Sequence, residues 1–95
     1  MKIVWSSKAA GALEECVDYI SKDKPETAKK WAERVFNKIE GLLEFPNIGK
    51  IKNQSGRGAL RQLVIEKDYL AVYRYTKDKC LIIAFKNTKQ RNTGS

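Results

Sequence analysis

The residues of this sequence that could do chemistry are its positively charged side chains. The 95-residue chain has 19 Lys and Arg, 11 Asp and Glu, and no histidine. Without histidine, general acid–base catalysis would require a Lys, Tyr, Glu or Asp side chain with a shifted pKa. The sequence shows no paired carboxylates in a known motif, no glycine-rich phosphate loop and no nucleophile elbow. Arginine and lysine at the end of a strand could still polarise a phosphate and stabilise the charge that develops on it.

Arg61 is the candidate for such a catalytic or anchoring role. It alternates with Leu63 and Ile65 along an apolar run, so a full charge shares a strand face with two aliphatic side chains. Two interpretations stay open. The arginine lies at a strand mouth with its stem packed and its head in water, or it has a functional partner, because arginine is seldom buried without one.

The net charge of +8 is unevenly distributed along the chain. Residues 7–45 hold seven Lys or Arg and eight Asp or Glu, whereas residues 46–95 hold eleven Lys or Arg and three acidic residues. Such asymmetry favours an anionic partner, namely nucleic acid, a ribonucleoprotein or an acidic protein segment, although it also fits a merely soluble basic surface. The predicted target contacts in this half are Lys50, Lys52, Arg57, Arg74, Lys86, Lys89 and Arg91.

Cysteine content and hydropathy argue against several other classes of protein. Cys16 and Cys80 are far apart and share no motif, so we expect two buried thiols, no metal site and no cofactor. The apolar run after Lys2 is too short for a signal peptide, and no segment approaches the ~20 apolar residues of a membrane span. We therefore expect a soluble cytoplasmic protein without a membrane partner.

The N-terminal half predicts a strand followed by two helices. Residues 2–5 form a β-branched and aromatic run, and Ser6 or Ser7 could cap the helix that follows. Pro25 fits the first turn of a second helix. An apolar stripe runs down this second helix and includes Trp31, which we expect in the core. The short breaker between the helices predicts an antiparallel helical hairpin.

The C-terminal half predicts strands separated by charged turns. Residues 58–75 indicate a β-hairpin that turns at Glu66-Lys67-Asp68, and the apolar run 80–85 is typical of a strand buried on both faces. Residues 50–58 are polar and contain glycine, which predicts a loop, and residues 86–95 predict a basic tail. The order β-α-α-β-β-β corresponds to one α+β domain over residues 1–95, with a helical hairpin packed on a small, mostly antiparallel sheet.

Tyrosines at period two in the hairpin allow two uses. Tyr69, Tyr73 and Tyr75 share one face of its second arm. They could stack a nucleobase, but tyrosines at this spacing more often serve packing.

Several of these segments together resemble the RelE/ParE toxin superfamily. They are a first strand closed by Trp5, Tyr19-Ile20 near the end of the first helix, and Phe45-Pro46-Asn47-Ile48-Gly49 after the second. The hairpin segment ALRQLVI at residues 59–65, followed by Tyr69 and by Val72-Tyr73-Arg74, is similar to the ParE-type plasmid stabilisation branch. The resemblance covers roughly residues 3–86.

The resemblance implies the toxin of a type II toxin–antitoxin module. Such toxins form hetero-oligomers with a small cognate antitoxin whose C-terminal segment wraps around them. RelE-like members enter the ribosomal A site and cleave mRNA without a metal, leaving a 2′,3′-cyclic phosphate. ParE-like members inhibit DNA gyrase.

Departures from the family pattern weigh most against the nuclease. Many relatives have Tyr-Arg where this chain has Tyr69-Leu70, and the histidines of some nuclease members are absent. Arg61 matches the ParE-type arginine and also a position where RelE-like enzymes carry a basic catalytic residue. We therefore predict a ParE-like toxin that binds DNA gyrase through Arg61, with Lys86, Lys89 and Arg91 as a charged rim. The alternatives are a ribosome-dependent, RelE-like mRNA endonuclease and a degenerate toxin that only binds its antitoxin.

Overall fold

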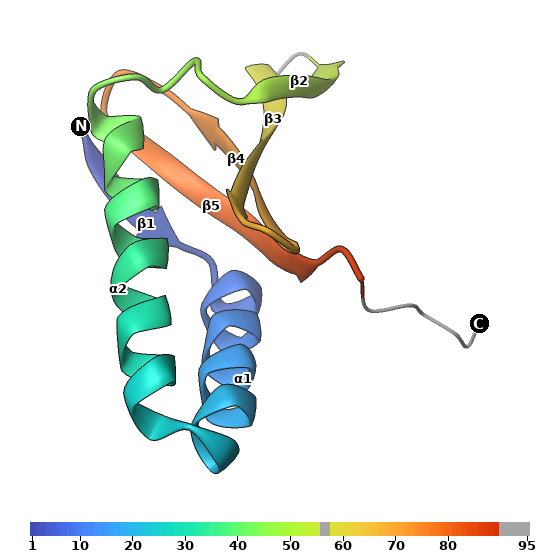
Figure 1. Cartoon of the computed structure of the whole chain (residues 1–95). Coiled ribbons are helices and arrows are strands. Elements are labelled where there is room, and N and C mark those ends of the chain that lie inside the picture. The colour runs from blue at the N-terminus through green and yellow to red at the C-terminus, as the bar shows by residue number, and fades with distance from the viewer. Residues whose placement is uncertain (56–57, 90–95) are drawn as a thin grey trace.

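The computed structural model describes residues 1–55 and 58–89 of the chain (Figure 1). A first strand precedes two helices and a short 3-10 helix, and four further strands complete the chain. The elements are β1 (Lys2–Trp5), α1 (Ser7–Asp23), α2 (Pro25–Glu40), η1 (Gly41–Leu43), β2 (Lys50–Ser55), β3 (Gly58–Glu66), β4 (Tyr69–Tyr75) and β5 (Lys79–Asn87). The α+β class and the helical hairpin followed by a hairpin-rich sheet are confirmed.

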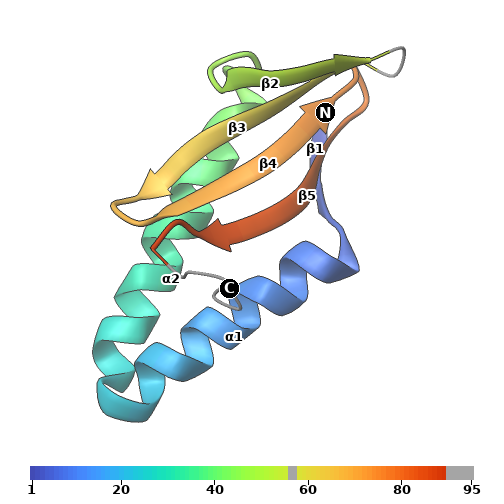
Figure 2. The same ribbon diagram turned by 90° about the vertical axis from the view of Figure 1, so that its right-hand side faces the viewer.

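The strands form one mixed five-stranded sheet in the order β1-β5-β4-β3-β2. β1 runs parallel to β5, and the other neighbours are antiparallel. Both helices lie on the same side of this sheet (Figures 1 and 2). The sheet therefore has one face covered by helices and a second face, here called the open face, that no described element covers.

An N-cap serine and a first-turn proline mark where the two helices begin. The Ser6 hydroxyl oxygen accepts a hydrogen bond from the Ala9 backbone N–H at 3.0 Å, so Ser6 is the N-cap of α1. Pro25 is in the first turn of α2, where its missing N–H is not needed. The Ser6 hydroxyl also donates to the carbonyl oxygen of Ile83 at 3.0 Å, which ties the start of α1 to β5.

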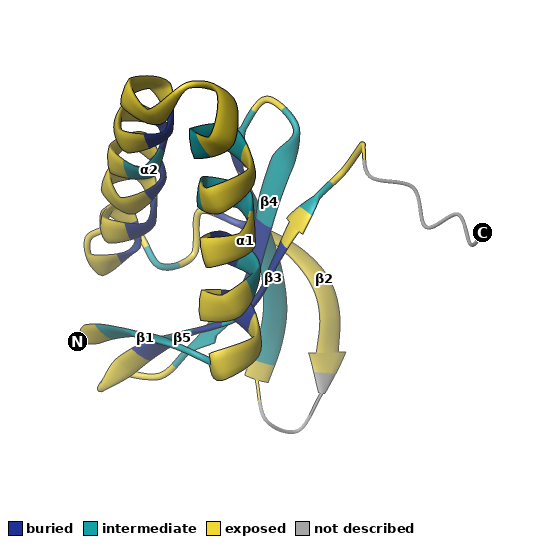
Figure 3. Ribbon diagram, turned by 90° about the horizontal axis from the view of Figure 1, so that it is seen from below, coloured by how far each residue is buried: buried dark blue, intermediate teal, exposed yellow. Residues whose placement is uncertain are grey.

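The core lies between the helices and the covered face of the sheet, where the buried residues of Figure 3 meet. Trp31 is in this core, as expected, with only 6% of its surface exposed. Its ring packs edge-on against Tyr69, with centroids 4.9 Å apart, and against Phe85, with centroids 6.1 Å apart. Each large side chain buried in this way contributes roughly 1.5–3 kcal/mol relative to an exposed position.

The prediction of a loop over residues 50–58 is wrong, because residues 50–55 form strand β2. β2 pairs with β3 from Lys50 opposite Gln62 to Ser55 opposite Gly58, with a register shift between Ile51 and Asn53. Its described side chains are all exposed, so an edge strand formed here without the apolar alternation that signals a strand. Backbone hydrogen bonding with β3 holds β2 as a strand, although its side-chain pattern does not indicate one.

Two features of β5, its end and its burial, also differ from the prediction. β5 continues to Asn87, so Lys86 belongs to a strand and not to a basic tail. The strand is not buried on both faces. Cys80 and Ile82 face the helices and are fully buried, whereas Leu81 and Ile83 are half-buried because the helices cover only one face.

Both cysteines are free thiols, Cys80 buried and Cys16 half-buried. Across residues 1–55 and 58–89, no helix is both long enough and apolar enough to cross a membrane.

Candidate target-contact surface

Arg61 holds the loop that leads from η1 into β2. On β3 it lies opposite Tyr73 of β4 and Ile51 of β2. Its Nη1 donates hydrogen bonds to the carbonyl oxygens of Asn47, at 3.0 Å, and Gly49, at 2.8 Å. The guanidinium carbon lies 5.9 Å from the centroid of the Tyr75 ring, within cation–π range.

Tyr73 holds the same loop from the core side. Its side chain is fully buried, and its hydroxyl donates to the Pro46 carbonyl oxygen at 2.7 Å and accepts from the Gly49 N–H at 2.9 Å. Burial raises the pKa of Tyr73, although the Gly49 N–H and the Arg61 charge oppose the shift. The hydroxyl therefore stays protonated at neutral pH and keeps its role as donor to Pro46.

Arg61, Tyr73 and Gly49 thus form one unit, here called the loop clamp. A side chain at position 49 has no room, because a Cβ there would lie 2.6 Å from the Tyr73 hydroxyl oxygen. The clamp fixes the backbone of residues 46–49 by four hydrogen bonds from two side chains of the sheet. The Arg61 head is bound by two backbone carbonyls, and a functional role for this residue stays a prediction.

One donor of Arg61 stays unused. Its Nε is buried and has no hydrogen-bond partner within residues 1–55 and 58–89. An unpaired buried donor costs roughly 1–3 kcal/mol, so the position of Arg61 carries some cost in stability.

Three of the predicted contact residues lie apart from one another on the open face. Lys50 lies opposite Gln62, Arg74 opposite Leu81, and Lys86 opposite Leu70. Directly paired residues of neighbouring strands point to the same side of a sheet, and these positions alternate with those of the core. Over the ranges that the structure describes, the side chains of Lys50, Arg74 and Lys86 have no ion-pair partner.

The other predicted contacts are placed differently or not described. Lys52 is exposed on β2, within its register shift. Lys89 lies away from the open face, where its ammonium is 3.8 Å from an Asp68 carboxylate oxygen. Arg57 and Arg91 lie outside the described residues.

Two basic residues that sequence reasoning missed join Arg74 on the open face. Lys79 shares a strand face with Leu81, and Lys2 is its register partner across the parallel pair of β1 and β5. Alternation from Leu81 could have placed Lys79. The position of Lys2 depends on the parallel pairing of two strands from opposite ends of the chain, which the sequence pattern does not reveal.

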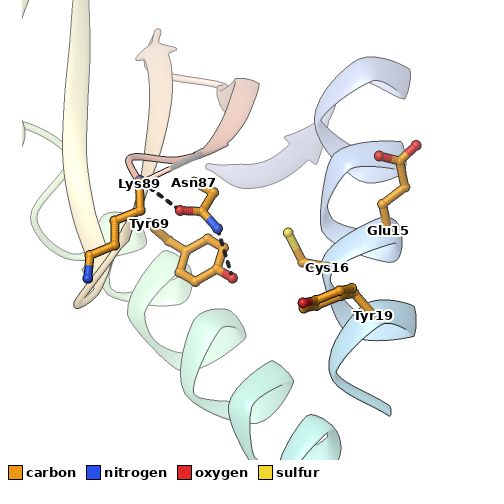
Figure 4. Close-up of a pocket in the computed structure, with 6 residues that line it drawn as sticks. All are labelled: Glu15, Cys16, Tyr19, Tyr69, Asn87 and Lys89. Atoms are coloured by element: carbon orange, nitrogen blue, oxygen red, sulfur yellow. Dashed lines mark hydrogen bonds between the residues drawn. The ribbon is translucent and has the colours of Figure 1, made fainter. Parts of the chain in front are cut away.

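A separate pocket lies between α1 and the ends of β4 and β5 (Figure 4). Its volume is about 480 Å³, and its lining residues are Glu15, Cys16, Tyr19, Tyr69, Asn87 and Lys89. The Asn87 amide nitrogen donates to the Tyr69 hydroxyl oxygen at 3.4 Å. Burial is the main cause of the raised pKa of both Cys16 and Tyr69. A neutral thiol is a weak nucleophile, so this pocket suits binding better than covalent chemistry.

The tyrosines face the core and not the open face. Tyr69 stacks on Phe85 with ring centroids 5.6 Å apart, Tyr73 is fully buried, and Tyr75 packs against the core. These three tyrosines therefore pack in or against the core. No group of three His, Cys, Asp or Glu side chains that could hold a metal ion occurs among the described residues.

Comparison with known proteins identifies the family. The sequence profile of the ParE toxin of the type II toxin–antitoxin system parDE matches residues 3–92. The chain is 32% identical over 79 residues to the protein named "Putative toxin Y4kP" of Sinorhizobium fredii, covering 81% of this chain and 78% of that one. A solved structure described as the chromosomal ParDE TA system from P. aeruginosa has the same fold, with a TM-score of 0.73. That match has 24% identity and covers 92% of this chain and 95% of the other. The protein therefore belongs to the ParE toxin family of type II toxin–antitoxin systems.

Proposed function

We propose that this toxin arrests growth by binding a macromolecular target, with DNA gyrase as the first candidate, through its basic surface. The observation that carries the proposal is the separation of charge between the two sides of the molecule. The lysines and the arginine of the open face and β2 form no ion pair in the described structure. Membership of the ParE family supports gyrase over other targets.

The acidic residues lie elsewhere in the described structure. Eight of them belong to α1, α2 or the segment directly after α2. The other three are at the ends of strands, where Glu66 pairs with Arg34 at 3.1 Å and Asp68 with Lys89 at 3.8 Å. An anionic surface would therefore be attracted to the sheet side and repelled from parts of the helical side.

Arg61 takes part in this proposal through the loop that it holds. Its two bonds to backbone carbonyls fix this loop beside Lys50. We therefore assign Arg61, whose side chain lies on the covered side of the sheet with Tyr73, as the anchor of the loop that leads into β2 and as a positioning residue. Lys50 and Lys52 follow this loop on β2, and Arg74 and Lys86 lie on the open face. Arg57, Lys89 and Arg91 stay predicted target contacts from the sequence.

The proton-transfer groups favour binding over nuclease action. The tyrosines with a raised pKa stay protonated at neutral pH, so they could donate a proton but could not act as a base. The Tyr73 hydroxyl is also already bonded to Pro46. An mRNA endonuclease at this surface could therefore not use these tyrosines as its general base.

The proposed partner in the cell is a small cognate antitoxin, in a toxin–antitoxin hetero-oligomer of the cytoplasm. The solved structure with the same fold is described as a ParDE system, which supports this partner. The basic surface suits an acidic antitoxin segment, and neutralisation by such a segment would cover the target contacts.

The test is induced expression in a bacterial host, combined with assays on purified protein. Wild type, Arg61→Ala and Arg61→Lys are compared in growth, in gyrase supercoiling and in ribosome-programmed mRNA cleavage. Growth arrest with inhibited supercoiling and intact mRNA is expected for wild type. Arg61→Ala should weaken inhibition about tenfold or more, as for an arginine at the centre of an interface. Arg61→Lys should rescue little, because a single ammonium cannot reproduce the guanidinium geometry.

Circular dichroism and thermal unfolding of each variant separate lost binding from lost folding. Cut mRNA with unaffected gyrase would overturn the proposal in favour of the endonuclease. Folded wild-type protein that arrests no growth would leave only the antitoxin-binding role.

A further inference from the structure

We propose that Lys2, Arg74 and Lys79 form a binding site for the phosphate backbone of duplex DNA at one end of the open face. The three residues are here called the β1–β5 cluster. This site goes beyond binding to a protein target, and it does not depend on gyrase being that target.

Strand pairing brings the cluster together from two ends of the chain. Lys2 and Lys79 are register partners across the parallel pair, so their Cα atoms are about 4.8 Å apart, the usual distance between strands. Arg74 lies opposite Leu81, which is two residues along the same face from Lys79. Three cations thus occupy adjacent positions on three neighbouring strands.

The cluster forms no ion pair in the described structure, although Asp78 directly precedes Lys79. The described ion pairs join Arg34 to Glu66 and Lys89 to Asp68, and neither involves the cluster. Like charges directly across a sheet destabilise it. The arrangement is therefore unfavourable for the isolated protein and becomes favourable once an anion binds.

A shallow cavity lies beside Arg74 and Lys79. It has a volume of about 250 Å³ and is lined by Arg74, Thr76, Lys79 and Leu81. The Thr76 hydroxyl oxygen accepts from the N–H groups of Asp78 and Lys79 at 3.2 and 3.3 Å, which shapes the turn beside the cavity. Arginine and lysine present donors only, and the phosphodiester backbone presents acceptors only.

The position of β4 and β5 inside the sheet favours nucleic acid over an extended acidic peptide as the ligand. β4 and β5 each have a strand on both sides, so their backbone groups are already paired. A peptide strand lying on this face would find no partners for its own N–H groups. A phosphodiester chain has no such donors to satisfy.

The side chains also favour a duplex over a single strand. The aromatic residues of β4 face the core, so the open face offers unstacked bases no aromatic platform within the described residues. Contacts to phosphates alone are independent of sequence and depend strongly on salt.

The test is fluorescence anisotropy of a labelled 20-base-pair duplex titrated with the full chain, over a series of salt concentrations. The cluster variant carries Lys2→Gln, Arg74→Gln and Lys79→Gln. The control carries Lys8→Gln, Lys22→Gln and Lys29→Gln, three exposed helix positions, so both variants lose the same charge. A charge-preserving variant carries Arg74→Lys and Lys79→Arg.

We expect wild type to bind, with log K falling steeply as log salt rises. Each neutralised phosphate contributes a slope of about 0.9, so the cluster variant should lose up to about 2.7 of the slope, and roughly tenfold or more in affinity at low salt. The control should lose much less, and the charge-preserving variant should bind nearly as wild type. Single-stranded DNA of the same length should bind more weakly than duplex DNA.

Two results would overturn the proposal. One is that the wild-type protein does not bind the duplex at low salt, and the other is that the cluster variant and the control variant lose the same duplex affinity. Purified antitoxin is titrated in parallel. Loss of antitoxin affinity with unchanged DNA binding would assign the cluster to an acidic polypeptide instead. The growth assay is scored separately, so failure here leaves the proposed toxin function untouched.

Discussion

Gly49 lies where two side chains of the sheet meet the loop that leads into β2. Its N–H and carbonyl oxygen are both bound, by Tyr73 and Arg61 respectively. Because the Tyr73 hydroxyl takes the space that a Cβ would need, this position requires glycine for its size. The loop clamp is thus a packing unit as well as a hydrogen-bonding one.

Gly49→Ala should therefore destabilise the protein. Its Cβ would lie 2.6 Å from the Tyr73 hydroxyl oxygen and 2.9 Å from the Gln62 carbonyl oxygen, and overpacking of this kind costs about 1–3 kcal/mol. Gly11→Ala is the matched control, since nothing lies within 4 Å of a Cβ there and α1 gains roughly 0.5–1 kcal/mol from alanine. Urea unfolding measures both. Equal stability of Gly49→Ala and wild type would contradict the clamp.

Cys80 gives the stability of the protein a dependence on alkaline pH. Complete burial raises the pKa of Cys80 from 9.0 to about 11 in the folded state. A pKa raised on folding means that the unfolded thiol loses its proton first. The stabilisation is therefore fully present below pH 9 and is lost as the pH rises towards 11. A shift of this size corresponds to about 2–3 kcal/mol.

We accordingly expect the free energy of unfolding to fall between pH 9 and 11. Cys80→Ala should remove this part of the fall, while Cys16→Ala, at a half-buried position, should remove less of it. Chemical denaturation at each pH provides the measurement. The tyrosines with a raised pKa add a further loss above pH 10 in all three proteins. An unchanged pH profile for Cys80→Ala would show that the thiol does not contribute.

At the scale of elements, Ser6 joins the first helix to the sheet. Its hydroxyl caps α1 through Ala9 and donates to Ile83 of β5, and its N–H donates to the Ile82 carbonyl oxygen at 2.9 Å. One residue therefore ends β1, begins α1 and fixes both against the strand that pairs with β1.

Ser6→Ala should lower the free energy of unfolding by about 1–2 kcal/mol, through loss of the cap and of the bond to β5. Ser7→Ala, one residue later at an exposed position, should change it by a few tenths of a kcal/mol. Ser6→Thr should recover most of the loss, since threonine can make both bonds. Thermal unfolding compares the three variants, and equal effects at positions 6 and 7 would contradict the role of Ser6.

At the scale of the whole molecule, the division of charge shapes both stability and binding. The helices α1 and α2 carry seven of the eleven acidic residues, and the open face carries cations without an ion-pair partner among the described residues. Repulsion among those cations opposes folding at low ionic strength, where screening is weak. A surface that retains mutually repelling cations at a cost in stability is typical of a binding site.

Lys79→Gln should consequently stabilise the protein at low salt, because it removes one of two lysines that face each other across β1 and β5. The expected gain is about 0.2–1 kcal/mol, and it should shrink as salt is added. Lys29→Gln on α2 is the control and should show little gain. Thermal unfolding at low and high salt measures the effect, and a loss of stability in Lys79→Gln would show that this lysine has a structural partner.

The sequence by itself determined the covered side of the molecule. Apolar stripes on two helices, the capping serine, the proline that opens α2 and the alternation of the hairpin are local signals, and each corresponds to an observed element. They also carried the resemblance to the RelE/ParE superfamily, because a family pattern consists of such local segments in a fixed order. The sequence pattern did not predict β2, because an exposed edge strand needs no apolar alternation.

Only the tertiary structure decided what surrounds the charged residues. The contacts of Arg61 with Asn47 and Gly49 bridge more than ten residues, and Lys2 meets Lys79 from the far end of the chain. Periodicity reports which face a side chain takes within its own element, but not which strands become neighbours. Strand order follows from burial of the whole core, and that order sets which cations share a surface.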